Sequence, residues 1–234
     1  MQLFFTPHID ENSNTFSFDK DESRHIVKVL RKAKGDLLTI TNGKGWLFEA
    51  EILQPDQKQC SVAIISKTKQ PPRPYTVHLA VAPTKMNDRF EWFLEKATEI
   101  GVDRITPLLC EHSERRVIKK ERYEKVIQAA TKQSLHYYMP ELDDLTLFDD
   151  FIKEKFTGEK YIAHCEETEK KSLKTELKPG SHVTILIGPE GDFSSREITE
   201  ARNSGFKPIS LGDTRLRTET AAIVACHSIA FINE

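Results

Sequence analysis

Cysteine is scarce in this sequence and follows no pattern. The four cysteines, Cys60, Cys110, Cys165 and Cys226, are widely separated, and no C-x-x-C pair occurs. This spacing argues against a zinc ribbon and against a thioredoxin-like redox motif, so we expect no bound metal. We predict isolated buried thiols, which fit a reducing cytosol better than an oxidising compartment.

Long apolar stretches are also missing. No run of 18 or more apolar residues occurs, which is the length that a membrane-spanning helix needs. The N-terminus lacks the basic region and the apolar run of a signal peptide. We therefore expect a soluble, cytoplasmic protein without a membrane partner.

The chain carries no strong charge of one sign. Lys and Arg number 34 against 36 Asp and Glu, so any basic surface for nucleic acid must be local. The length of 234 residues, 38% of them hydrophobic, predicts one or two domains with a substantial core.

A proline-rich segment divides the sequence. Residues 69–74 contain three prolines within four positions, which neither a helix nor a central strand accommodates. We therefore predict two domains, 1–70 and 71–234. Before the linker, the alternation of residues 36–53 around the Asn42–Gly45 turn predicts a hairpin. A further strand at 59–66 and a helix at 22–32 complete a predicted small β-barrel.

After the linker, patterns of strands and helices alternate, which predicts an α/β domain with a largely parallel sheet. The spacing of apolar residues over 87–100 is helical, with Gly101 as its C-cap. Ser194 and Glu197 form a capping box at the start of another helix. We predict strands at 76–82, 105–109, 160–164, 182–187 and 208–211, and helices at 87–100, 123–135, 194–204 and 218–231.

The segment 188–194 follows a predicted buried strand. Ligands in open α/β sheets bind beyond the carboxyl ends of strands, and glycines let the backbone approach them closely. The segment is neither G-x-G-x-x-G nor a P-loop, so a dinucleotide site and a P-loop site are not indicated. From these residues alone, an ordinary turn explains the segment equally well.

The segment 211–221 also joins a strand to a helix. Arg215 and Arg217 beside a helix start are suited to an anion or a phosphate. The alternative is an ordinary capped helix, with Thr218 as cap, Glu219 complementing the helix dipole and the arginines solvated. The residues alone leave both interpretations open.

A local excess of positive charge lies in residues 21–34. Five basic and two acidic side chains give a net charge of +3, excluding His25. Arg24, Lys28 and Arg31 share one face of the predicted helix, as phosphate contacts require. A solvated amphipathic face would look the same. In the second domain, the stripe could continue through Lys85, Arg89, Arg115 and Arg116.

Four stretches of the chain, in the same order, match the motifs of one family. They are Arg24-His25-x-x-x-Val29-Leu30-Arg31, Glu95–Val102, Gly188-Pro189-Glu190-Gly191-x-Phe193-Ser194, and Leu211-Gly212 with Leu216–Ala221. Together they resemble the ribosomal RNA small-subunit methyltransferase E family of the SPOUT class. Asp192 and His136 depart from that family's pattern, which usually has glycine and arginine at these positions.

The resemblance implies methylation of N3 of a uridine in small-subunit (16S) ribosomal RNA, either as naked RNA or in the assembled subunit, with S-adenosylmethionine (SAM) as cofactor. It also implies a PUA-like N-terminal β-barrel, a trefoil knot in the C-terminal parallel sheet, and a homodimer. The apolar helix 218–231 fits such a dimer, although plain core packing explains it too. The expected cofactor contacts are His164, Ile187, Gly188, Pro189, Glu190, Gly191, Leu211, Gly212, Leu216, Arg217 and Thr218.

The remaining expected site residues contact RNA or take part in the chemistry. Arg217 suits a uracil oxygen that gains negative charge. Glu219 suits the N3 proton, although it would serve equally to orient Arg217 or to cap the helix. The expected RNA contacts are Arg24, His25, Lys28, Arg31, Lys85, Arg115, Arg116 and Gln133.

Two alternatives remain from the sequence. One is a different SPOUT enzyme that acts on transfer RNA or on a ribose 2′-hydroxyl. The other is a non-catalytic RNA-binding assembly factor, for which an intact cofactor loop would serve no purpose.

Overall fold

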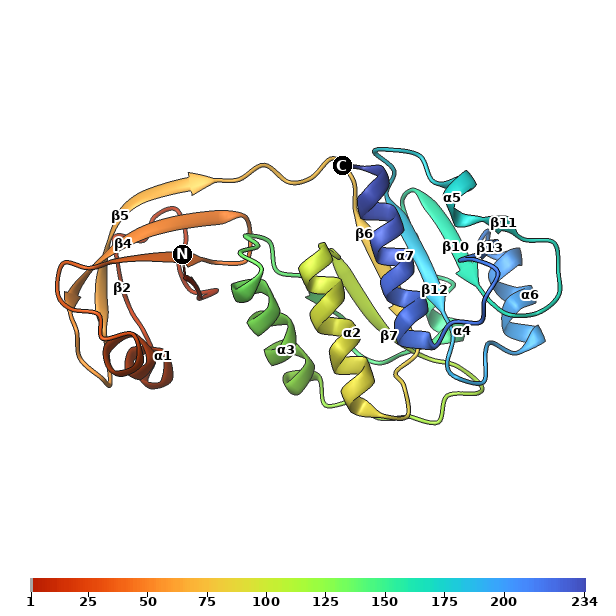
Figure 1. Ribbon diagram of the computed structural model, residues 1–234, viewed down its shortest axis with the longest axis horizontal. Helices are drawn as coiled ribbons and strands as arrows, with labels where there is room; N and C mark the ends of the chain where they lie inside the picture. The colour runs from red at the N-terminus through yellow and green to blue at the C-terminus, as the bar shows by residue number, and fades with distance from the viewer. Residues whose placement is uncertain (1) are drawn as a thin grey trace. The chain divides into compact units, whose positions relative to one another are not determined.

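The computed structural model describes residues 2–234, and the chain forms two compact units (Figure 1). The first unit runs to Pro72 and includes Thr131–Met139. The second comprises Arg73–Ala130 and Pro140–Glu234. The division near the proline-rich segment resembles the predicted one, but a single cut misses the segment 131–139.

Hydrogen bonds explain why residues 131–139 belong to the first unit. The backbone amide of Gly45 donates to the carbonyl of Tyr137 over 2.9 Å, and Lys44 pairs with Tyr138 in a β-bridge. Lys132 lies 2.6 Å from Glu22, so an ion pair joins this segment to the first helix. The segment therefore satisfies backbone groups of the β3–β4 turn that would otherwise lack partners.

The first unit is built on a five-stranded sheet in the order β1-β3-β4-β5-β2. The β1–β3 pair is parallel, and the other pairs are antiparallel. Alternate side chains of the sheet pack with Ile26 into one buried core. The predicted hairpin is confirmed, whereas the two three-residue strands were not predicted. The strands are β1 Leu3–Phe5, β2 Thr15–Ser17, β3 Leu37–Thr41, β4 Trp46–Gln54 and β5 Ser61–Lys69.

The helix predicted over residues 22–32 is wrong in its length and its geometry. The structure has a short α-helix, α1 (Lys20–Arg24), followed directly by a π-helical turn, η1 (His25–Val29). Arg31 lies beyond the turn with a φ of 55°. The wider turn breaks the i, i+4, i+7 spacing, so the three cations do not share one α-helical face.

The second unit contains an eight-stranded sheet in the order β11-β13-β10-β12-β6-β7-β8, with β9 also paired to β7. Every pair is parallel, so the predicted α/β class and parallel sheet are confirmed. The central strands β6 and β12 are buried on both faces, as expected of apolar parallel strands. The strands are β6 Val77–Val81, β7 Arg104–Leu109, β8 Glu141–Leu142, β9 Thr146–Leu147, β10 Glu159–Ala163, β11 Lys171–Ser172, β12 Val183–Ile187 and β13 Lys207–Ser210.

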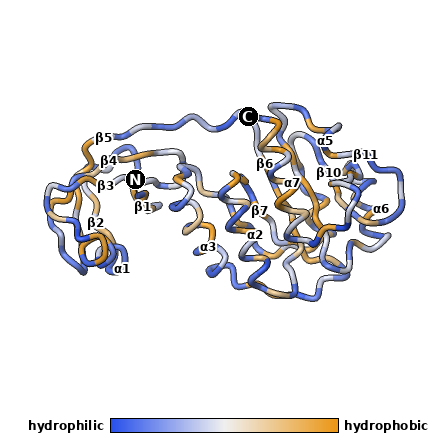
Figure 2. Tube along the Cα trace, in the orientation of Figure 1, coloured by the Kyte–Doolittle hydropathy of each residue, from blue (hydrophilic) through white to orange (hydrophobic). Residues whose placement is uncertain are grey.

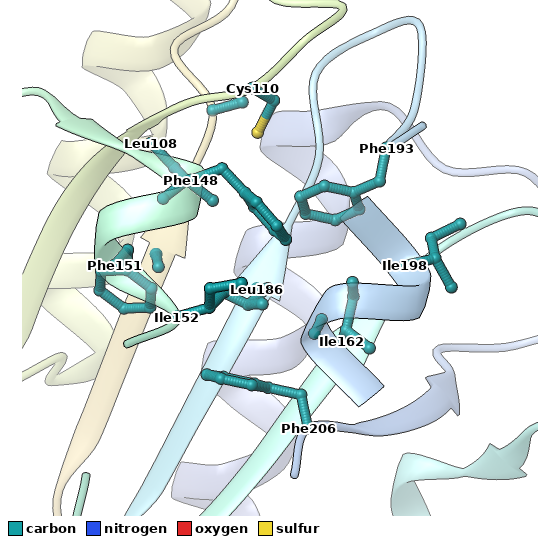
Figure 3. Close-up of a cluster of buried hydrophobic side chains, with 13 residues drawn as sticks. Leu108, Cys110, Phe148, Phe151, Ile152, Ile162, Leu186, Phe193, Ile198 and Phe206 are labelled. Carbon is teal, nitrogen blue, oxygen red and sulfur yellow. The ribbon is translucent and has the colours of Figure 1, made fainter. Parts of the chain in front are cut away.

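Helices cover both faces of this sheet. α4 and α6 pack over an apolar cluster that includes Leu186, Phe148 and Phe206 (Figure 3). α2 and α7 pack against each other on the opposite face, where α7 contacts β6 and β12 (Figure 1). Hydrophobic residues concentrate along α7 and the central strands (Figure 2). The helices are α2 Asn87–Ile100, α3 Lys120–Gln133, α4 Phe148–Phe151, α5 Leu173–Glu176, α6 Ser195–Asn203 and α7 Thr218–Ile232.

The predicted helix signals give mixed results. Gly101 is the left-handed C-cap of α2, and Ser194 with Glu197 forms the capping box of α6, both as predicted. At α7, however, the N-cap is Arg217, and Thr218 is the first helical residue. Among the cysteines, Cys165 is exposed rather than buried.

Candidate functional site

The candidate site lies at the carboxyl edge of the second unit's sheet. Because all these strands are parallel, the segments that follow β6, β7, β10, β12 and β13 emerge along one edge. Residues 188–194, which follow β12, we call the β12 loop. Residues 211–217, which follow β13 and lead into α7, we call the β13 loop.

Neighbouring segments hold the β12 loop in place. The Thr218 hydroxyl donates to the carbonyl of Gly188 over 3.0 Å, which fastens the loop to the first turn of α7. The amide of Lys85 donates to Glu190 Oε1 over 2.9 Å. His112 Nδ1 lies 3.1 Å from the carbonyl of Gly191. The loop is therefore preorganised by contacts that no single stretch of sequence reveals.

Asp192 forms a further link across this edge. Its Oδ2 accepts a hydrogen bond from the amide of Cys165 over 2.7 Å, and its Oδ1 accepts one from the amide of Phe193 over 2.9 Å. Its φ of 61° is a left-handed conformation, which glycine adopts more readily than other residues. The side chain thus ties the β12 loop to the end of β10.

Gly188 is required by packing inside the protein. A Cβ at this position would lie 3.0 Å from the Phe193 ring and 3.1 Å from the backbone nitrogen of Phe193. Phe193 belongs to the apolar cluster under α4 and α6 (Figure 3). Phe193 therefore leaves little room for a side chain at position 188.

A hollow of about 430 Å³ lies between the end of β10 and the β13 loop. His164 lines it and is 7% exposed, and neither of its ring nitrogens has a hydrogen-bond partner within residues 2–234. Burial lowers the pKa of His164, and the nearby Lys170 adds to the lowering, so the ring favours its neutral form. Leu211, Gly212 and Leu216 also line this hollow.

A second hollow of about 390 Å³ adjoins the first and shares its Leu216 wall. It is lined by Ile187, Gly188, Pro189, Glu190, Arg217 and Thr218, all of which were predicted cofactor contacts. The predicted Gly191 lines a neighbouring hollow beside Asp192. The structure thus brings the residues predicted for the cofactor together around the two loops.

A third hollow of about 730 Å³ lies on the α2 side of the β13 loop. Both predicted catalytic residues, Arg217 and Glu219, line it. Glu219 Oε1 lies 3.9 Å from Arg89 Nε, so the charge nearest to Glu219 comes from α2. Arg89 is therefore a partner of Glu219 that the sequence did not predict.

The site contains residues that the sequence did not single out. Trp92 lines the third hollow, and Cys165 lines the first two. Their common signal is position, since each lies beyond a parallel strand or on the helix that faces the β13 loop. That signal needs the strand order, which the sequence does not provide.

The neutral and anionic groups of the first two hollows fit an adenosyl cofactor. The unpartnered nitrogens of His164 offer hydrogen bonds inside a buried wall, as a polar heterocycle needs. Leu211 and Leu216 provide apolar surface beside them. Glu190 provides an acidic group that an ammonium group would complement.

The residues predicted to bind RNA fall into both units. In the first unit, Arg24, Lys28 and Arg31 are exposed, and Gln133 is exposed at the end of α3. His25 is half-buried, with its Nε2 2.9 Å from the side chain of Gln2. The first unit therefore presents its predicted cations to solvent.

Two of the three predicted RNA contacts of the second unit, Lys85 and Arg115, are engaged within the protein. Lys85 pairs with Glu114 over 2.8 Å. Arg115 is half-buried and donates from Nε to the carbonyl of Thr84 over 2.9 Å and from Nη2 to that of Lys85 over 2.7 Å. Arg116 is exposed. Arg115 therefore braces the segment after β6, which the sequence did not predict.

Residues 2–234 offer neither a metal site nor a membrane-spanning helix. No group of His, Cys, Asp or Glu side chains in this range could hold a metal ion. Within the same range, each helix is too short or too polar to span a lipid bilayer.

Comparison with known families agrees with this arrangement. A family model described as an RNA methyltransferase domain matches residues 71–230, and one described as an RNA methyltransferase PUA domain matches residues 18–65. These matches define the class as RNA methyltransferases with a PUA domain. More narrowly, the chain belongs to the ribosomal RNA small-subunit methyltransferase E family.

Individual relatives match over nearly the whole chain. The ribosomal RNA small subunit methyltransferase E of Buchnera aphidicola is 33% identical over 225 residues, covering 92% of this chain and 88% of the relative. A Porphyromonas gingivalis structure named as an rRNA-methyltransferase is 40% identical, with a TM-score of 0.92 and coverage of 100% and 98%. A Legionella pneumophila methyltransferase, solved with bound SAM, is 31% identical, with a TM-score of 0.87 and coverage of 99% and 97%.

Proposed function

We propose that this protein methylates N3 of a uridine in small-subunit ribosomal RNA with SAM as the methyl donor. The proposal rests mainly on one observation at the β13 loop. Residues of this loop line both the two hollows suited to a cofactor and the third hollow, which is lined by Arg217 and Glu219. Membership of the methyltransferase E family and the SAM-bound relative support the proposal.

The cofactor is held by the first two hollows. His164 and the backbone of the β13 loop take the adenosine portion, with Leu211 and Leu216 as apolar walls. Glu190 and the backbone around Gly188 take the amino-acid portion. When bound, SAM supplies a methyl group on a positively charged sulfur, which becomes a neutral thioether once the methyl group has gone.

The side chains of the third hollow prepare the acceptor base. Glu219 accepts the proton of N3, and the electron pair left on N3 forms the new bond to the methyl carbon. The guanidinium of Arg217 stabilises negative charge on a uracil oxygen, because it stays ionised and donates several hydrogen bonds. N3 lies on the pairing edge, so the uridine must be unpaired when it enters the site.

The two units have different functions, one in RNA binding and the other in methyl transfer. The first unit is the RNA-binding PUA-like domain, with phosphate contacts from Arg24, Lys28 and Arg31. The second unit is the SPOUT methyltransferase domain, with the predicted trefoil knot at the site. The hydrogen bond from Thr218 to Gly188 joins the exit of the β13 loop to the β12 loop.

The protein acts in the cytoplasm as a homodimer. The support for a dimer lies on α7, whose Phe231 is 69% exposed although the helix is apolar. Light scattering at micromolar concentration should give twice the monomer mass of 26.8 kDa. Replacing Phe231 with Asp should shift the mass towards the monomer, and a wild-type monomer would refute the dimer.

Single-turnover methyl transfer with saturating SAM tests the roles of the two catalytic residues. Arg217→Ala should slow transfer even when SAM is saturating. Glu219→Gln should be slow at neutral pH and should partly recover as the pH rises and N3 ionises unaided. A fully active Arg217→Ala removes the first role, and a wild-type rate and pH profile in Glu219→Gln removes the second.

A further inference from the structure

The third hollow combines an unusual set of side chains. Arg89 and Trp92 enter it from α2, whereas Arg215, Arg217 and Glu219 enter from the β13 loop and the start of α7. Asp88 adds one carboxylate at the α2 side. Three guanidinium groups therefore surround a hollow that has a buried carboxylate and an indole in its walls.

Glu219 is the most informative member of this set. It is 8% exposed, and its Oε2 has no hydrogen-bond partner within residues 2–234. Its Oε1 lies 3.9 Å from Arg89 Nε, so one side of the carboxylate faces a cation. A buried carboxylate oxygen without a donor is unfavourable, which indicates that a ligand supplies the donor.

Trp92 provides the second, independent observation. The side chain is 45% exposed, although its neighbours Phe90 and Phe93 on α2 are fully buried. An exposed aromatic ring beside arginines is typical of sites where unpaired bases stack. The combination of an aromatic face, a hydrogen-bond acceptor and surrounding positive charge matches an unpaired nucleotide that carries an N–H group.

We propose that the third hollow is the acceptor-base site, in which the unpaired uracil stacks on Trp92 and directs its N–H to the Glu219 carboxylate. Arg89 is a positioning residue, because its Nε lies 3.9 Å from Glu219 Oε1 and so helps to hold that carboxylate. This inference rests on the proposed function and adds Trp92 and Arg89 to it. The alternative occupant is a second copy of this chain.

Tryptophan fluorescence tests the stacking directly. The chain has two tryptophans, Trp46 and Trp92. Trp46 lies in the first unit and packs on Phe48, so a Trp46→Phe variant leaves Trp92 as the single reporter. Adding a single-stranded oligouridylate at low salt should quench Trp92 emission saturably. An oligomer of 3-methyluridine, which lacks the N3 donor, should bind at least tenfold more weakly.

Substitutions separate the role of each residue. Trp92→Ala should weaken oligouridylate binding about tenfold, and Trp92→Phe should restore most of it, with SAM affinity unchanged in both. Arg89→Ala should lower kcat more than it raises KM and should shift the pH profile of methyl transfer, and Arg89→Lys should recover part of the rate. An Arg89→Ala enzyme with the wild-type pH profile would refute the positioning role.

The outcomes distinguish RNA from a second copy of the chain as the occupant of the third hollow. They also separate failure of the base site from failure of the proposed function. If a second copy of the chain covers Trp92, the Trp92 emission will change with protein concentration and will not change when RNA is added. That result overturns the base site. If RNA quenches Trp92 but no uridine is methylated, the base site stands and the proposed function fails. If uridine is methylated while Trp92→Ala binds RNA normally, the proposed function stands and the base site fails.

Discussion

Asp192 Oδ2 accepts a hydrogen bond from the backbone amide of Cys165 over 2.7 Å, and this bond joins the β12 loop to the end of β10. The two segments are far apart in sequence and border the same hollows. At the Asp192 φ of 61°, glycine would adopt the backbone conformation more readily. Asp192 therefore adopts a less favourable left-handed backbone conformation than glycine would, but its side chain provides a hydrogen bond across the site.

Substitution of Asp192 should separate these two effects. Asp192→Ala loses both side-chain bonds and keeps the left-handed backbone, whereas Asp192→Gly loses the bonds and relaxes the backbone. Denaturant unfolding should show the glycine variant to be more stable than the alanine variant by about 1 kcal/mol. Calorimetry should show both variants binding SAM about tenfold more weakly, equivalent to about 1.4 kcal/mol. Wild-type affinity in both variants would show that the link does not preorganise the site.

Gly188 and Phe193 should be energetically coupled. A Cβ at position 188 would lie 3.0 Å from the Phe193 ring, so Gly188→Ala should lose about 1–3 kcal/mol of unfolding free energy. In a Phe193→Leu background the smaller side chain leaves room, and the same substitution should cost less. A double-mutant cycle by denaturant unfolding measures this coupling. Purely additive effects would show that Gly188 is needed for another reason.

The buried His78 should make stability depend on pH. Its Nε2 lies 2.8 Å from the hydroxyl of Thr106. Burial lowers the pKa of His78 from 6.5 to about 4, and Arg104 adds to the lowering while Asp143 opposes it. The unfolded chain therefore binds a proton between these values that the folded protein does not bind.

Because the pKa of His78 is lowered in the folded protein, protonation of this residue favours the unfolded chain. The contribution of His78 to the free energy of unfolding is fully present above pH 6.5. This contribution falls as the pH drops towards 4, by at most about 3 kcal/mol. A His78→Gln variant keeps a hydrogen-bonding side chain but does not titrate. Its unfolding free energy should depend less on pH than that of the wild type across this range. Parallel pH profiles for the two proteins would contradict the assignment.

Salt dependence should identify the phosphate contacts of the first unit. Replacing Arg24 and Lys28 with Gln removes two exposed cations at the α1–η1 helix, so the slope of log affinity against log salt should fall by roughly one per lost contact. The matched control is Lys58→Gln, an exposed lysine of the same unit at the β4–β5 turn. Equal slopes for the double variant and the control would place the RNA elsewhere. SAM affinity should stay unchanged throughout.

The sequence predicts best where several local signals agree. α2 lies over exactly the predicted residues because its apolar spacing is helical and Gly101 ends it. The capping box at Ser194 is equally local. The π-turn at His25–Val29 was not predicted because its residues have ordinary helical propensity, and the burial of Ile26 in the core cannot be seen in the local sequence.

The candidate site was predicted only where local motifs in the sequence identify its residues. The loop motifs identified Gly188, Leu216 and Glu219, which the structure brings to one edge of the sheet. The approach of Arg89 to Glu219 is a contact between α2 and α7, and no local pattern encodes it. The same holds for the segment 131–139, which joins the first unit through backbone hydrogen bonds.

The central claim is that this protein methylates N3 of a uridine in small-subunit ribosomal RNA. The most direct test incubates the purified protein with SAM and either naked 16S RNA or assembled small subunits, then digests the RNA to nucleosides for mass spectrometry. The claim predicts one new 3-methyluridine in at least one of these substrates, formed much more slowly when Glu219→Gln replaces the wild type at neutral pH. Methylation of a ribose 2′-hydroxyl, or SAM binding without any methylated nucleoside, would contradict it.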